Sequence, residues 1–246
     1  MMSSLLSQTN LSDYSLLSND LSQLDERTVL VTKWNWNYSE SHAFQRHALT
    51  ILQNFPRMRV FVACSHPHLF TNGRGLQKPK KGQDFNLIEF KKEDASKLPF
   101  PFYQIERGGG LTFHHSGQFI FYPIVKLNPH TLSLSKMIDD ILGVSKSVLN
   151  DWGLHHLTTE NALLGLWHQN QKLASMGIAI EKLTTFHGMA LNLKHDTQMS
   201  AALKVLNPCG INAETYTSVE DLISLPPNSV ETFSQSFFQR LTHAWQ

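Results

Sequence analysis

The sequence predicts an α+β fold in which a mixed β-sheet core is flanked by helices. Short β-branched and aromatic runs favour strands, and segments with apolar residues every three or four positions favour helices. These segments do not alternate regularly, as the repeated βαβ units of a parallel α/β protein would. The chain has 246 residues, of which 41% are hydrophobic and 17% charged. Such a composition suits a globular protein with a substantial core.

The first part of the domain is predicted to contain two strands and one helix. Residues 28–34 (TVLVTKW) and 58–64 (MRVFVAC) have strand composition, and Ser39 is the predicted cap of a helix that ends near Asn54. Residues 70–75 (FTNGRG) have the composition of a turn. The lysine-rich residues 78–97 contain proline and glycine and are predicted to form an exposed loop.

The second part begins with residues 118–125 (QFIFYPIV), a nearly continuous apolar run that indicates a strand buried on both faces. Apolar residues from Leu134 to Trp152 recur at three- and four-residue steps, which predicts an amphipathic helix ending at Gly153. Further predicted elements are strands at 162–167, 172–180 and 184–193, the first two joined by the polar turn HQNQ, and short helices at 218–224 and 229–244.

Residues 1–27 form a predicted N-terminal extension, loosely ordered or docked, before a single domain at 28–246. The extension alternates Ser and Leu with acidic residues and lacks the basic and apolar regions of a secretory signal. Apolar runs stay below the roughly 18–20 residues of a membrane span. A net charge of +1 gives no reason to expect nucleic acid as a partner. Two cysteines make no disulfide framework, so we expect a reducing, cytoplasmic compartment.

Cys209 is the first candidate for chemistry. It lies in the turn LNPCGIN, where Pro208 restricts the backbone and Gly210 permits close approach. A nucleophilic cysteine needs a neighbouring histidine, lysine or helix N-terminus that favours the thiolate. Both Cys209 and Cys64 could instead be small buried hydrophobes, and Cys64 fits that interpretation better because it ends an apolar strand.

Lys172 is a candidate for the activating neighbour, although a solvated lysine at a strand edge would look the same. His187 lies among apolar residues, and the default interpretation is a histidine buried in the core. His114 and His115 are adjacent, so on a strand they would point to opposite faces and would not share a metal. We therefore predict no metal site.

The segment Glu106–Gln118 (ERGGGLTFHHSGQ) combines a glycine run with two histidines directly before the buried strand. It could be a turn, a phosphate cradle or the wall of a substrate pocket. The run lacks the G-x-x-x-x-G-K-[ST] pattern and does not open a helix, which argues against a nucleotide phosphate cradle.

Four motifs in order resemble the octanoyltransferases of lipoate biosynthesis: ERGGGLTFHHSGQFIFYPI, QKLASMGIAI, FHGMALNL and NPCGI. An early segment, HPHLFTNGR (66–74), is similar as well, and the resemblance covers roughly residues 28–225. It implies the α+β fold of the biotin and lipoate ligases. The chain departs from the family pattern at His115-Ser116, where the family has a small residue and proline, and has Phe113 in place of the common Tyr.

The resemblance implies that Cys209 is an acyl-thioester nucleophile and that Lys172 lowers its pKa and handles protons. The implied donor is octanoyl acyl carrier protein. The implied acceptors are the lipoyl domains of 2-oxoacid dehydrogenases and the glycine cleavage H protein, and no metal, nucleotide or other cofactor is needed. Implied acyl-pocket residues are Arg107, Gly108, Gly109, Gly110, Leu111, Thr112, Phe113, His114, Ser175, Met176, Gly177, Gly188, Met189 and Ala190.

Two other classes stay open from the sequence. A lipoate or biotin ligase of the same fold would bind ATP and form an acyl-adenylate. A non-catalytic acyl-binding module would form no covalent adduct.

Overall fold

The structure is a computed structural model and describes residues 5, 7–75, 95–96, 98–160, 163–206 and 215–245. Cys209 and nearly all of the predicted loop at 78–97 lie outside the described residues.

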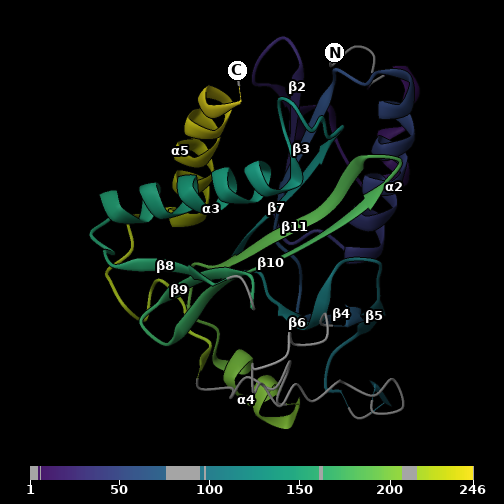
Figure 1. The fold of residues 1–246 in the computed structure, drawn as a ribbon. Helices are drawn as coiled ribbons and strands as arrows, with labels where there is room; N and C mark the ends of the chain where they lie inside the picture. Colours follow the sequence, from purple (N-terminus) through teal and green to yellow (C-terminus); the bar gives the residue numbers. More distant parts are fainter. Residues whose placement is uncertain are drawn as a thin grey trace, which may run out of the picture.

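An eight-stranded mixed sheet forms the centre of the molecule (Figure 1). In spatial order its strands are β1 (Leu21–Gln23), β2 (Thr28–Lys33), β3 (Arg59–Cys64), β7 (Gln118–Val125), β11 (Thr184–Asn192), β10 (Gln171–Glu181), β9 (Gly165–His168) and β8 (Leu157–Glu160). Only the β2–β3 pairing within it is parallel. The α+β prediction is confirmed.

Strand β7 lies in the middle of this sheet and is buried along its whole length, as predicted. Its side chains alternate between two hydrophobic clusters because successive residues of a strand point to opposite faces. Phe119 and Phe121 pack on one face, and Ile120 and Tyr122 pack on the other.

Helices cover both faces of the sheet (Figure 1). Helix α2 (Tyr38–Asn54) packs against β7 and β11 on one face. Helices α3 (Leu134–Asp151) and α5 (Ser229–Ala244) contact each other and pack on the opposite face. Within the described residues, no helix combines the length and apolar composition needed to cross a bilayer.

A smaller three-stranded sheet lies beside the main one and contributes one wall of the site. Its strands are β5 (Phe102–Gln104), β4 (Leu69–Gly75) and β6 (Gly109–His114), in the order β5-β4-β6. Helix α4 (Thr197–Leu206), which is remote from β6 in sequence, contacts that strand.

The N-terminal extension is docked on the domain. Strand β1 pairs antiparallel with β2 and so extends the main sheet at its edge. Leu5, Leu16 and Leu21 are buried in the cluster beneath α2, and the Trp36 indole donates a hydrogen bond of 2.9 Å to the Tyr14 carbonyl.

Residues 70–75 are part of strand β4, and the prediction of a turn there was wrong. Gly73, one of the glycines that suggested a turn, has a packing role. A Cβ at Gly73 would lie 2.3 Å from the Gly109 carbonyl oxygen and 2.6 Å from that of Arg107, so only glycine fits there.

The predicted helix at 218–224 was also wrong, because these residues form a turn. The Asp221 carboxylate accepts hydrogen bonds from the Ser218 N–H and hydroxyl at 3.0 and 2.7 Å, which closes the turn locally. The predicted N-cap Ser39 is inside α2, and Asn37 is the cap, with its side chain accepting from the Ser39 and Glu40 N–H groups.

Candidate active site

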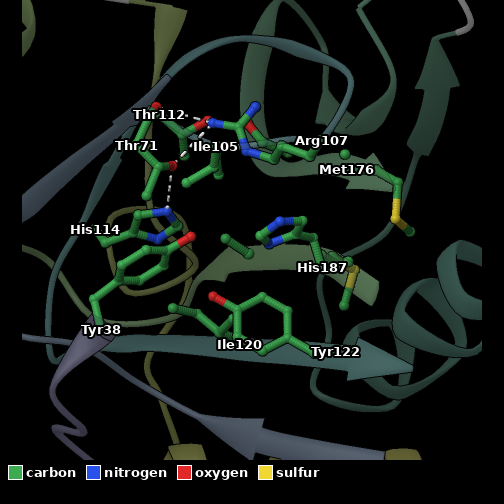
Figure 2. A pocket seen from close by; sticks show the side chains of 15 residues that line it. Tyr38, Thr71, Ile105, Arg107, Thr112, His114, Ile120, Tyr122, Met176 and His187 are labelled. Carbon is green, nitrogen blue, oxygen red and sulfur yellow. Dashed lines mark hydrogen bonds between the residues drawn. The ribbon is translucent and has the colours of Figure 1, made fainter. Parts of the chain in front are cut away.

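A cavity lies where the small sheet meets β7, β10 and β11 (Figure 2). It holds about 370 Å³ of empty space, part of it continuous with solvent. Ile105, Ile120 and Met189 make part of its wall apolar, and buried polar side chains make up most of the rest. Mixed lining of this kind is typical of small-molecule sites, in which few polar groups orient an otherwise apolar ligand.

Most of the acyl-pocket residues implied by the resemblance lie around this cavity. Those that line it are Arg107, Thr112, His114, Ser175, Met176, Gly177, Gly188, Met189 and Ala190. Leu111 and Phe113 instead line a second, adjoining cavity, which shares Thr112, Ser175 and Ala190 with the first.

The glycine run fixes the path of the loop that precedes β6. Gly108, Gly109 and Gly110 are absent from the lining of both cavities. Gly109 has φ of +82°, a left-handed conformation that glycine adopts without steric cost, and the Gly108 N–H donates to the Ile178 carbonyl at 3.2 Å. These two observations explain why glycine is needed in the run, and its place in an acyl pocket stays a prediction.

Gly177 and Gly188 bring the loop and the sheet together at the cavity wall. They are directly opposite each other in the β10–β11 pair. A Cβ at Gly177 would lie 2.9 Å from both the Arg107 Cδ and the Gly108 carbonyl oxygen, and one at Gly188 would lie 2.0 Å from the Phe121 carbonyl oxygen. Glycine at both positions permits these close approaches.

Arg107 is a buried cation that organises the cavity wall. One of its guanidinium nitrogens donates to the Thr71 carbonyl, the Thr71 hydroxyl and the Thr112 hydroxyl at 2.8–3.0 Å, and another donates to the Gly108 carbonyl at 3.0 Å. Hydrogen bonds from an ionised donor are the stronger class in proteins. Arg107 thus joins β4, β6 and the start of the glycine run.

His114 continues this network as a neutral imidazole. Burial, together with the nearby His66 and Arg107, holds its pKa well below the ordinary value for histidine. Its Nε2 lies 3.0 Å from the Thr71 hydroxyl and its Nδ1 lies 3.1 Å from the Gln118 side-chain oxygen Oε1. The ring therefore donates through Nδ1 and accepts at Nε2.

The same network extends toward Lys172. The Gln118 amide donates to the Asn192 side-chain oxygen at 2.8 Å, and the Asn192 amide donates to the Thr217 carbonyl at 3.1 Å. The Thr217 N–H in turn donates to the Lys172 carbonyl at 3.2 Å. A chain of buried hydrogen bonds therefore links the cavity wall to the segment that follows Cys209 in sequence.

Lys172 is buried, with 6% of its surface exposed, so the solvated strand-edge interpretation does not describe it. Its Nζ lies 5.3 Å from the Trp167 ring centroid on the neighbouring strand, within the range of a cation–π contact. Its Cε lies 3.0 Å from the Cβ position of Gly165, so a side chain there would press on it. Lys172 also forms a β-bridge with Tyr216.

Cys64 has the structural role expected of it. It is fully buried in strand β3, and burial raises the pKa of its thiol, which disfavours the thiolate. Neighbouring His66 donates through Nδ1 to the Trp36 carbonyl at 2.7 Å, and its Nε2 lies 3.0 Å from the Tyr122 hydroxyl.

His115 directly follows the last residue of β6 and is buried outside the cavity. Its Nδ1 lies 3.7 Å from the Asp196 carboxylate beside α4, and burial lowers its pKa to about 4. The imidazole that replaces the family's small residue therefore lines neither cavity.

Several residues of the cavity were missed in the sequence: Tyr38, Thr71, Ile105, Ile120, Tyr122 and His187. Figure 2 shows the Tyr38, Tyr122 and His187 side chains around the cavity, with the His187 ring close to that of Tyr122. The buried Tyr38 hydroxyl has no hydrogen-bond partner among the described residues, so it is available to a ligand. Ile120 and Tyr122 lie two positions apart in the apolar run at 118–125. That run was the one sequence signal that could have located these two residues.

The arrangement of the two sheets and their helices is the lipoate ligase-like fold. Solved structures with this fold include lipoate-protein ligase A bound with ATP, with a TM-score of 0.65 at 14% identity over 89% of this chain and 86% of that one. Another is a bi-partite lipoate protein ligase from Thermoplasma acidophilum, with a TM-score of 0.60 at 14% identity over 90% and 85%. At this identity the likeness establishes the fold alone.

Sequence comparison identifies the family. Residues 37–242 match the model of the lipoyl protein ligase A/B catalytic domain, and the chain belongs to this family. An octanoyltransferase of Synechococcus elongatus is 33% identical over 74% of this chain and 73% of its own length. An octanoyltransferase of a Nostoc species is 30% identical over 81% and 84%. A chloroplastic octanoyltransferase of Arabidopsis thaliana is 30% identical over 76% of this chain, which spans 62% of that protein.

Proposed function

We propose that this protein is an octanoyltransferase of lipoate biosynthesis. It takes an octanoyl group from octanoyl acyl carrier protein and transfers it to a lysine ε-amine of a lipoyl domain. The similarity to octanoyltransferases over about three quarters of the chain is the observation that carries this proposal. The cavity between β6, β10 and β11 supports it, because apolar side chains there offer a surface to a hydrocarbon chain.

In the first step the Cys209 thiolate attacks the carbonyl carbon of the donor thioester. A carbon–sulfur bond to Cys209 forms, the bond to the carrier sulfur breaks, and the carrier leaves as a thiol after taking a proton. In the second step the acceptor amine attacks the Cys209 thioester. A carbon–nitrogen bond forms, the amine loses a proton, and the Cys209 sulfur is released.

Lys172 supplies the positive charge and the base for these steps. A nearby cation lowers a thiol pKa from about 8.5 to between about 3.5 and 7.5, which makes the thiolate available at neutral pH. Burial of Lys172 favours its neutral form, so it also loses a proton more readily than a solvated lysine. Tyr216, seven positions after Cys209, bridges to Lys172, and this supports placing the two reactive groups together.

His114 and Tyr38 orient the acyl group in this proposal. His114 is held by hydrogen bonds on both ring nitrogens, so its ring forms a fixed part of the wall. The Tyr38 hydroxyl is the polar group available to a carbonyl oxygen. The acceptors are the lipoyl domains of 2-oxoacid dehydrogenases and the glycine cleavage H protein.

The test uses a purified lipoyl domain with two donor systems. We expect octanoyl acyl carrier protein to octanoylate the lipoyl-domain lysine without ATP, and free octanoate with ATP to give no product. Product only from octanoate and ATP would identify a ligase, which is the activity of the ATP-bound structural relative. No product from either system would favour a binding module.

A further inference from the structure

Three side chains from distant parts of the sequence converge beside the acyl cavity: His42 of α2, Glu106 just before β6, and His187 of β11. The Glu106 Oε2 lies 3.2 Å from the His42 Nε2 and 3.7 Å from the His187 Nε2, and one ligand atom of each residue lies within 4.8 Å of the others. The two imidazole rings are stacked, with centroids 5.3 Å apart. We call these three residues the His–Glu–His cluster.

The converging atoms contact one another as His–Glu ion pairs but make no hydrogen bond of standard geometry among the described residues. His42 Nε2, Glu106 Oε2 and His187 Nε2 are each buried. The His187 side chain is 2% exposed. Three such atoms facing one another are unusual, because nearly all buried polar atoms in native proteins are paired.

His187 is also held in a strained backbone conformation. Its φ is +57°, which is uncommon for any residue other than glycine. Its main-chain N–H donates to the Gln45 side chain at 2.8 Å, which helps to hold this conformation. Strain of this kind persists where the surroundings fix it and is concentrated at functional sites.

The chemistry of the cluster suits a cation. His42 and His187 offer imidazole nitrogens and Glu106 offers a carboxylate oxygen, which are ligand types that bind zinc in proteins.

We propose that His42, Glu106 and His187 form a binding site for a divalent transition metal of the zinc class. Two imidazole nitrogens and one carboxylate oxygen make a three-ligand set for Zn²⁺ that leaves a fourth position open. Zn–N distances of about 2.0–2.1 Å imply tetrahedral ligand atoms about 3.4 Å apart. The two His–Glu separations of 3.2 and 3.7 Å bracket that value.

A bound ion would join α2, the start of the glycine run and β11 at one point. Glu106 directly precedes Arg107, which lines the acyl cavity, and His187 lines that cavity itself. The site therefore fixes two parts of the cavity wall to the helix that covers them. His42 and Glu106 are 25% and 35% exposed, which leaves a route for an ion from solvent.

Metal binding itself is the test, and its readout does not depend on acyl transfer. Metal-free protein without a histidine tag is titrated with Co²⁺, whose visible absorption reports four-coordinate binding, and Zn²⁺ is then added in competition. We expect one Co²⁺ per chain, displaced by Zn²⁺. Glu106→Gln and His42→Asn should each weaken binding by about tenfold or more, since loss of a ligand costs at least as much as loss of an outer-shell partner.

His68→Gln is the matched control, because His68 belongs to another histidine–carboxylate pair, with Asp196 at 2.8 Å. It should bind Co²⁺ like the wild type. Zn²⁺ should also raise the unfolding temperature of the wild type and the control, but not of Glu106→Gln. Failure of the wild type to bind either metal would overturn the proposal, as would wild-type affinity in both cluster variants or loss of binding in His68→Gln.

Discussion

Gly177→Ala tests whether the loop that precedes β6 is held against strand β10. The added Cβ would lie 2.9 Å from the Gly108 carbonyl oxygen and 2.9 Å from the Arg107 Cδ. Because one of these atoms belongs to the backbone, relief requires the loop to move. Overpacking of this kind costs about 1–3 kcal/mol.

The unfolded chain offsets part of that cost. Alanine has less conformational freedom than glycine when unfolded, which stabilises the folded state by about 0.4–1 kcal/mol. We therefore expect a net loss of about 1–2 kcal/mol in the free energy of unfolding. Displacement of Arg107 should also alter the cavity, so loading of an octanoyl group should fall more than loading of an acetyl group.

Gly143→Ala is the control, because a Cβ at this exposed helical position would meet no atom within 4 Å. It should raise the free energy of unfolding by about 0.5–1 kcal/mol, the usual helix preference for alanine. Urea unfolding gives the stabilities, and mass spectrometry with octanoyl and acetyl donors gives the loading. Wild-type stability and wild-type octanoyl loading in Gly177→Ala would refute the close loop packing.

Other predictions concern Lys172 and His66. Lys172→Ala should slow alkylation of Cys209 at pH 7 by about tenfold for each unit that the thiol pKa rises. Lys172→Arg should keep part of the self-acylation but lose transfer to the acceptor lysine, because a guanidinium group cannot act as a base near pH 7. A pH series of iodoacetamide alkylation with single-turnover transfer measures both, and an unchanged midpoint with intact transfer would remove Lys172 from the mechanism. Burial lowers the pKa of His66 to about 4, so its contribution to stability is present above pH 6.5 and is lost as the pH falls toward 4. Between pH 8 and pH 5, protonation of His66 should lower the free energy of unfolding by about 2 kcal/mol, as measured by urea titration. His66→Asn should not show this loss. Equal pH dependence of stability in the wild type and His66→Asn would contradict the buried neutral imidazole.

Elements with one strong local signal were predictable from the sequence. The apolar run at 118–125 and the periodic helix before Gly153 appear as β7 and α3. Glycine misled the prediction at 70–75, since Gly73 serves close packing against residues 107–109, which no local pattern reports. The turn at 218–224 depends on the hydrogen bonds from Ser218 to the Asp221 carboxylate. The spacing of apolar residues, on which the helix was predicted, does not report these bonds.

The site was predictable where it coincided with family motifs. Its remaining features depend on contacts across the fold. Burial of Lys172 requires Gly165 and Trp167 on the neighbouring strand. The His–Glu–His cluster joins residues from a helix, a loop and a strand that are remote in sequence. The prediction of no metal site weighed His114 with His115 and stays a prediction, and no local pattern reports the convergence of His42, Glu106 and His187.

The central claim is that Cys209 carries the acyl group. The most direct measurement is the intact mass of the protein after incubation with octanoyl acyl carrier protein, followed by peptide mapping of the adduct. We predict one octanoyl group on the Cys209 peptide, its absence in Cys209→Ala, and its retention in Cys64→Ala, since Cys64 is fully buried. An octanoyl adduct that survives in Cys209→Ala would contradict the account.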